Sequence, residues 1–264
     1  MSDRALYVYG VVPNASPPTL FEAVRGVDPS EAVILVSDGD LAAVASAVRL
    51  DEFGETSIEE NLRDPSWLAE KARAHDGVLA AAVGRTTVLP FRFGAIYRSE
   101  DQVRDLLRER TDFPATLARL EGTIELGVKA YLDVDVQRER LAAGEDAEGV
   151  GSAGRAYMQR KQLDRRLDEE VERFAARCAH DSHERLAAAV QESRTNALPQ
   201  PEAGDMARTM ILNGAYLVPA GAVERFRDAL GELERGHQPD GVDYELSGPW
   251  PPYNFVADES GRRP

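Results

Sequence analysis

Four residues in the second half of the chain are of the types that bind zinc. Cys178, His180, Asp181 and His183 lie in residues 152–193, where apolar side chains recur every three or four positions and predict a long helix. Ligands on one helix face must be three or four residues apart, so His180 and His183 can share a face while Cys178 points away. Cys178 also falls on the apolar stripe. The spacing therefore predicts a buried cysteine and no metal site.

A glycine motif precedes this helix. Residues 149–154, Gly-Val-Gly-Ser-Ala-Gly, match the G-x-G-x-x-G pattern of dinucleotide-binding folds. Such a fold needs a strand just before the motif and an acidic residue about 20 positions later, at the end of the next strand. Here a charged segment with Glu145, Asp146 and Glu148 comes first, and a helical pattern follows. The motif indicates a loop that leads into a helix, and no cofactor is expected.

His75 is the remaining candidate for acid–base chemistry. It lies on the apolar face of a helix predicted from Asp64-Pro65 onward, which favours a histidine of the core with a hydrogen-bonded ring. The sequence offers it no nucleophile or acid partner, and it contains neither a G-x-S-x-G elbow nor a P-loop. We therefore expect a protein that is not an enzyme.

Arg92 stands in the apolar segment Val88–Tyr97, between Phe91 and Phe93. A buried arginine must be paired or hydrogen-bonded, so this interpretation predicts that Arg92 joins a strand to the following helices. Losing it would then cost about 3–5 kcal/mol of stability. The alternative is an anchor for a partner protein, because arginine flanked by aromatic residues is typical of binding hot spots.

The elements that must position these residues follow in two similar halves. In the first half, β-branched and aromatic runs predict strands, Asp38-Gly39 predicts a hairpin turn, and Asp64-Pro65 predicts a helix start. Ser99 and Gln102 form a predicted capping box. The predicted strands are residues 5–12, 32–36, 41–48 and 86–91; the predicted helices are 19–24, 65–83, one that starts at Ser99, and 113–120.

The second half predicts a strand over 123–136, an exposed polar loop over 137–150, the long helix, a strand over 210–219, a helix over 222–233 and a strand over 242–246. Both halves suggest a βαββαβ order, so we expect an α+β chain whose C-terminal domain is ferredoxin-like and whose N-terminal domain is a related α+β sheet with helices. The predicted divisions are an N-terminal domain 1–96, a helical linker 97–122, a C-terminal domain 123–247 and a Pro/aromatic tail 248–264.

Composition excludes several classes of partner. The chain carries 31 basic and 46 acidic residues, a net charge of −15, which argues against nucleic acid and against anionic membrane surfaces. Its residues include no apolar run of about 20 and no pattern typical of a signal peptide near Met1. The single cysteine suits a reducing compartment, so a cytoplasmic location is expected.

Four motifs, in order along the chain, resemble the gas vesicle L/F protein family. They are the opening LYVYGVV from Leu6, VLPFRFGAIY from Val88, GRAYMQRKQ from Gly154 and LSGPWPPYNF from Leu246. The resemblance implies two α+β domains, the second ferredoxin-like, without catalysis or cofactor. It implies an accessory role in gas vesicle assembly or nucleation, through contact with the small hydrophobic shell protein and other accessory proteins, and a location at the gas vesicle.

Within these motifs, the residues expected to contact partners are Arg92, Phe93, Tyr157, Trp250, Tyr253 and Phe255. The prolines from Gly248 onward predict an extended tail without regular structure. In that tail Trp250 is expected to pack back on the chain's own domains, whereas Tyr253 and Phe255 are expected to stay partly exposed for a partner. The alternative function is an enzyme or small-ligand-binding protein on tandem ferredoxin-like domains, because the fold alone permits it.

Overall fold

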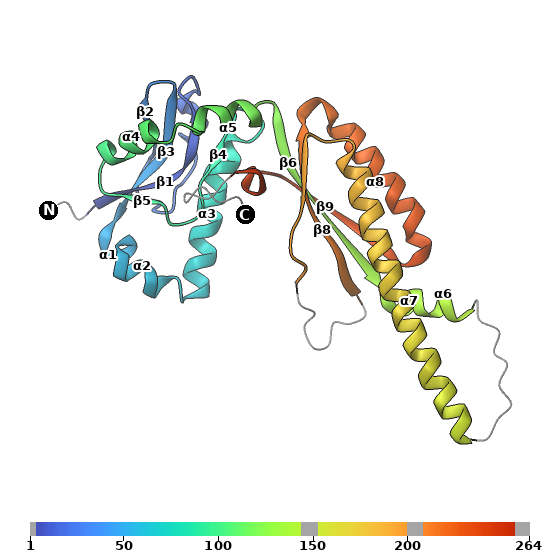
Figure 1. Ribbon diagram of the computed structural model, residues 1–264. Helices are drawn as coiled ribbons and strands as arrows, with labels where there is room; N and C mark the ends of the chain where they lie inside the picture. Colours follow the sequence, from blue (N-terminus) through green and yellow to red (C-terminus); the bar gives the residue numbers. More distant parts are fainter. Residues whose placement is uncertain (1–3, 144–152, 200–207, 257–264) are drawn as a thin grey trace. The chain divides into compact units, whose positions relative to one another are not determined.

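The computed structural model describes residues 4–143, 153–199 and 208–256. The fold is α+β with two antiparallel sheets (Figure 1). The contacts divide the described residues into two units. Unit 1 comprises the described residues of Met1–Glu125 and Pro249–Pro264. Unit 2 comprises the described residues of Leu126–Gly248.

The first sheet has the strand order β2-β3-β1-β4, with β5 also pairing with β1. Its strands are β1 (Arg4–Pro13), β2 (Val33–Asp38), β3 (Leu41–Arg49), β4 (Leu89–Pro90) and β5 (Ile96–Tyr97). The three long strands confirm the predicted strands 5–12, 32–36 and 41–48. The strand predicted over 86–91 is wrong in length, because only Leu89 and Pro90 pair with β1.

Two glycines shape this sheet. The predicted hairpin turn is present, but its two central residues are Gly39 and Asp40 rather than Asp38 and Gly39, since Asp38 pairs with Leu41 and Gly39 takes φ +57°. A Cβ added to Gly10 would lie 2.5 Å from the carbonyl oxygen of Leu89, so glycine is what lets β4 approach β1. The register between β1 and β3 shifts between Val8 and Gly10. This bulge brings Val12 onto the same core face as Tyr7 and Tyr9.

The helices of unit 1 pack on this sheet. They are α1 (Leu50–Phe53), α2 (Glu55–Asn61), α3 (Pro65–Ala82), α4 (Glu100–Glu109) and α5 (Phe113–Leu120). The predicted caps are confirmed: Asp64 accepts from the backbone N–H of Ser66 at 2.8 Å, and Ser99 accepts from that of Gln102 at 3.3 Å. The helical turn expected over 19–24 is a short 3-10 helix, Pro18–Leu20. The sequence prediction missed α1 and α2.

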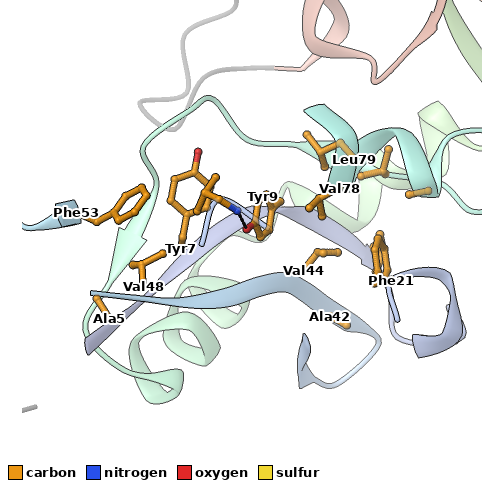
Figure 2. Packing of buried hydrophobic residues seen from close by; sticks show 14 residues of the cluster. Ala5, Tyr7, Tyr9, Phe21, Ala42, Val44, Val48, Phe53, Val78 and Leu79 are labelled. Carbon is orange, nitrogen blue, oxygen red and sulfur yellow. Dashed lines mark hydrogen bonds between the residues drawn. The ribbon is translucent and has the colours of Figure 1, made fainter. Parts of the chain in front are cut away.

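Strand β1 lies at the centre of unit 1, since every residue from Ala5 to Val12 is buried. Helices α3 and α5 contact β1, and α4 contacts β2 and β3. Successive residues of β1 point to opposite faces of the sheet, and all from Ala5 to Val12 are buried, so both faces of the strand are covered. Figure 2 shows Tyr7 and Tyr9 of β1 packed with Val78 and Leu79 of α3. The Tyr9 hydroxyl accepts from the backbone N–H of Val27 at 2.9 Å and bonds Ser46 at 2.7 Å, which ties one loop and strand β3 to this core.

The second sheet has the order β7-β8-β6-β9. Its strands are β6 (Thr123–Asp133), β7 (Glu192–Thr195), β8 (Arg208–Pro219) and β9 (Val242–Trp250). Helices α7 (Ala153–Ala187) and α8 (Val223–His237) both contact β8, and a shorter helix, α6 (Val134–Ala143), contacts α7. In β6, alternate residues from Leu126 to Leu132 are buried, the pattern of a sheet with one covered face.

Three predictions about the second half are wrong. Residues 137–143 belong to helix α6 rather than to an exposed loop, because Asp133 ends the strand and accepts from the backbone N–H of Val136 at 3.0 Å. Residues 192–195 form strand β7 instead of continuing the long helix. The tail begins with regular structure, since β9 continues to Trp250. Proline at 249 is compatible with this because β9 is an edge strand.

In the part of the chain that the structure describes, no helix is both long enough and apolar enough to span a membrane.

Candidate partner-binding surface

The segment after β4 forms a short loop beside β1. The backbone N–H of Phe91 donates to Tyr9 O at 2.9 Å, and the backbone N–H of Val8 donates to Ala95 O at 2.8 Å. Between these two anchors Gly94 takes φ +99°, a conformation that side chains rarely adopt. The loop is therefore held at both ends by the central strand, and its turn depends on glycine.

Arg92 is exposed, and the prediction of a buried, paired arginine is wrong. Strand β4 ends at Pro90, and Phe91 makes one further backbone bond to β1, from its N–H to Tyr9 O. Neighbouring side chains of an extended segment point to opposite sides, and here Phe91 turns inward while Arg92 turns to solvent. Within the described residues, no carboxylate forms an ion pair with Arg92. Its guanidinium is available to a partner.

Phe93 lies next to Arg92 and is half-buried. Its ring centroid is 5.7 Å from that of Tyr7, 6.0 Å from that of His75 and 6.2 Å from that of Trp67. The contacts are edge-on, the geometry that aromatic pairs prefer. Phe93 is thus fixed by aromatic packing on one side while its other side remains accessible.

A buried hydrogen-bond chain supports the loop from below. The Tyr7 hydroxyl lies 2.9 Å from His75 Nδ1, and His75 Nε2 lies 3.2 Å from Phe91 O. The carbonyl can only accept, so Nε2 carries a proton, and in the neutral ring Nδ1 accepts from the Tyr7 hydroxyl. The Tyr7 oxygen in turn accepts from the backbone N–H of Gly94 at 3.1 Å. His75 is a core histidine, as its place on the apolar face predicted, with both ring nitrogens bonded.

The tail packs against the same region. The Tyr253 hydroxyl donates to Asp76 Oδ1 at 2.9 Å, and the Tyr253 ring stacks on His75 with centroids 6.4 Å apart. Burial, and then the neighbouring Asp76 carboxylate, raise the pKa of the Tyr253 phenol. Tyr253 is half-buried, so one side of this ring also remains accessible.

Asn254 and Phe255 anchor the tail. The buried carboxylate of Glu125 accepts from Asn254 twice, from the backbone N–H at 3.1 Å and from the side-chain amide at 2.6 Å. Phe255 is 2% exposed, and its carbonyl accepts a hydrogen bond from the Arg119 guanidinium. The residues after β9 are therefore fixed to unit 1.

The expected roles of the tail aromatics are reversed. Trp250 is 47% exposed at the end of β9, where it was expected to pack inward, and Phe255 is buried, where it was expected to be partly exposed. The backbone explains the exchange: β9 carries Trp250 outward along a sheet edge, and the 3-10 helix Tyr253–Phe255 turns Phe255 inward. The partial exposure expected of Tyr253 is confirmed. The side chain of Tyr157 lies outside the described residues.

Phe93 and Tyr253 pack on the buried His75, Trp67 packs on Phe93, and Arg92 precedes Phe93 in the loop; we call these four residues the Phe93 surface. Three half-buried aromatic rings and one exposed guanidinium are the residue types enriched in binding hot spots. The sequence prediction included Arg92, Phe93 and Tyr253 but missed Trp67. Its helical spacing of eight residues from His75 could have indicated the shared face.

The residues considered for zinc belong to unit 2. Cys178 is buried, as predicted, with its sulfur 3.4 Å from His237 Nδ1 and 3.7 Å from the Tyr244 hydroxyl. Burial raises the pKa of the Cys178 thiol. His183 lies 3.1 Å from the Tyr216 hydroxyl, and His180 lies near Glu184. The described residues contain no group of three metal-binding side chains. The glycines at 149 and 151 lie outside the described residues.

Comparisons with known proteins agree on one family. The family model described as gas vesicle synthesis protein GvpL/GvpF matches residues 5–257. Gas vesicle protein L of Streptomyces sp. strain CB03234 is 34% identical over 260 residues, covering 97% of this chain and 94% of that protein. Gas vesicle protein F of the same strain is 31% identical over 258 residues, covering 95% of this chain and 98% of that protein.

Two solved structures share the fold over almost the whole chain. The crystal structure of GvpF from Anabaena sp. PCC7120 has a TM-score of 0.69 at 18% identity and covers 96% of this chain and 95% of that one. That of GvpF from Microcystis aeruginosa has a TM-score of 0.63 at 20% identity and covers 95% of this chain and 98% of that one. The family model, the relatives and the fold all extend across both units, and this chain belongs to the GvpL/GvpF family of gas vesicle proteins.

Proposed function

We propose that this protein acts in gas vesicle assembly or nucleation by binding the small hydrophobic shell protein and other accessory proteins. Family membership gives the coarser statement, a gas vesicle accessory protein. The finer statement, direct binding, is supported by one observation: three half-buried aromatic rings pack together over a hydrogen-bonded scaffold, and the exposed Arg92 immediately precedes one of them, Phe93.

The physical requirement is plain. A small shell subunit with an apolar face needs that face covered before it assembles, and aromatic side chains supply large apolar area for such contact. The Phe93 surface is also rigid, because the loop from Phe91 to Ala95 is bonded to β1 at both ends. A surface that is already ordered loses little entropy when it binds. The location that follows from this proposal is the growing gas vesicle.

We also infer that unit 2 has the ferredoxin-like fold expected from the sequence. The element order β6-α7-β7-β8-α8-β9 and the strand order β7-β8-β6-β9 support this inference. The domain boundary between residues 122 and 123 stays a prediction.

The experiment is a binding assay with the purified shell protein. Immobilised full-length chain should capture it, and Phe93→Ala and Arg92→Ala should each weaken capture about tenfold or more, the range of hot-spot residues. Arg98→Ala is the matched control, since Arg98 is an exposed arginine six positions further along. Equal capture by all four proteins would contradict the Phe93 surface, and no capture by the wild-type chain would contradict direct binding.

A further inference from the structure

A second surface of unit 1 has a different chemistry. A groove of about 320 Å³ runs between the end of β1 and the start of β3 on one side and helix α5 on the other. Its floor is made by Leu41 and Leu117, both largely buried. Pro13, Pro114 and Ala118 form its walls. We call this the Leu117 groove, and it shares no residue with the Phe93 surface.

The rim of the Leu117 groove is acidic. Asp40 and Glu121 line it, and both side chains are exposed. Nearby carboxylates of the same unit are paired with arginine: Asp38 with Arg108 at 2.8 Å and Asp112 with Arg110 at 2.9 Å. No cation within the described ranges pairs with Asp40 or Glu121. An apolar groove flanked by two unneutralised carboxylates is complementary to an apolar side chain flanked by cations.

The wall formed by α5 indicates what shape of partner fits. Pro114, Leu117 and Ala118 recur at the spacing i, i+3 and i+4, so one face of the helix lines the groove, and Glu121 lines it as the C-cap residue just beyond α5. Ala118 is small, which lets another backbone approach closely. A second helix can pack its side chains against such a face with axes about 8–10 Å apart. The volume lies at the low end of small-molecule pockets, about 300–1,000 Å³, and suits a few aliphatic side chains.

The opposite wall is held in place before any partner arrives. The backbone N–H of Asn14 donates to Asp40 O at 2.8 Å, and the Asn14 side-chain amide donates to Gly39 O at 2.9 Å. The Ser37 hydroxyl donates to Asn14 Oδ1 at 2.7 Å. These bonds fix the β2–β3 turn, and with it Asp40, to the end of β1. A preformed wall reduces the ordering cost of binding.

We propose that the Leu117 groove binds a cationic amphipathic helix of a partner protein. Leucine-type side chains of that helix fill the groove over Leu41 and Leu117, and its lysines or arginines contact Asp40 and Glu121. This inference goes beyond the proposed function, because it concerns another surface and is tested without the shell protein.

The test uses a synthetic Leu/Lys peptide of about 18 residues, long enough to be helical in water, with leucines at helical spacing. Its binding to the full-length chain is measured by titration calorimetry at about 0.15 M salt. We expect saturable one-to-one binding. Replacing every lysine by glutamate, or every leucine by serine, should abolish it.

Variants of the chain locate the site. Ala118→Trp fills the groove and should abolish binding, while Ala115→Trp, an exposed alanine on the same helix outside the groove, should not. Asp40→Asn with Glu121→Gln should weaken binding about fivefold, as expected for two exposed ion pairs. Glu109→Gln, an exposed carboxylate away from the groove, is the charge control.

Three results would overturn the proposal. Unchanged binding by Ala118→Trp would place the peptide elsewhere. If Glu109→Gln weakened peptide binding as much as Glu121→Gln, the peptide would be responding to the overall negative charge of the chain and not to the carboxylates of the groove. If the glutamate peptide bound as tightly as the lysine peptide, the proposed charge complementarity would be wrong. A circular-dichroism spectrum of each variant checks that it is folded, so that a loss of binding is not caused by unfolding.

Discussion

The Tyr7 hydroxyl donates to His75 Nδ1 across 2.9 Å inside unit 1, and this bond links the central strand to helix α3 beneath the Phe93 surface. Because His75 Nε2 donates to the Phe91 carbonyl, Nδ1 of the neutral ring is the acceptor for the Tyr7 hydroxyl. Burial lowers the pKa of His75, in agreement with this state. The ring that packs against Phe93 is thus an uncharged histidine near neutral pH.

Acidification should therefore destabilise unit 1. The native pKa of His75 lies below the unfolded value of about 6.5, so the unfolded chain binds more protons as the pH falls through this value. The stabilisation is complete above about pH 6.5 and decreases by about 1.4 kcal/mol per pH unit until the native pKa is reached. Urea unfolding between about pH 7.5 and 5 measures this slope.

His75→Gln is the control for that measurement. His183 also has a lowered pKa, so the wild-type slope contains more than one histidine and only the difference between the two proteins belongs to His75. Identical slopes would show that His75 does not supply the pH dependence.

Arg92→Ala should leave stability unchanged within about 0.5 kcal/mol, because the side chain is exposed and forms no ion pair within the described residues. Thermal unfolding followed by circular dichroism checks this, with Arg98→Ala alongside. A loss of about 3–5 kcal/mol would restore the buried-arginine interpretation that the structure replaces.

Truncating the two aromatic rings at the ends of the tail should cost very different amounts of stability. Phe255→Ala removes a side chain that is 2% exposed and should cost about 3–5 kcal/mol. Trp250→Ala removes a ring that is 47% exposed and should cost less than about 1 kcal/mol. Chemical denaturation of both variants provides the comparison, and a larger cost at Trp250 would contradict the observed packing of the tail.

Cys178 should resist alkylation in the folded protein. The thiol is buried, and burial raises its pKa, so little reactive thiolate is present near neutral pH. Iodoacetamide treatment followed by mass spectrometry should show modification only after denaturant is added. Rapid alkylation without denaturant would indicate that α7 opens away from Tyr244 in solution.

Local signals in the sequence predict much of the fold. Asp64 and Ser99 cap the helices that follow them, a hairpin turn forms at Gly39 one position from the predicted centre, and α5 has the predicted bounds. These elements are set by neighbours in the sequence, which is why spacing and residue type reveal them.

The wrong predictions concern residues whose structure depends on contacts with distant parts of the chain. Arg92 was expected inside because its neighbours are apolar, yet its exposure depends on β4 ending at Pro90. The tail at Pro249 was expected to be irregular, yet an edge strand tolerates proline. For α6 a signal was present, since Asp133 is a suitable cap, but the apolar run through Val136 resembled a longer strand.

The most direct measurement is complementation in cells that carry the other gas vesicle genes. A deletion of the gene for this chain is complemented with wild type, with Phe93→Ala or with Arg98→Ala, and gas vesicles are counted by electron microscopy. The proposed function predicts vesicles with wild type and Arg98→Ala, and few or none with Phe93→Ala at equal protein level. Normal vesicle numbers with Phe93→Ala would contradict the role of the Phe93 surface, and normal numbers in the uncomplemented deletion would contradict a role in assembly.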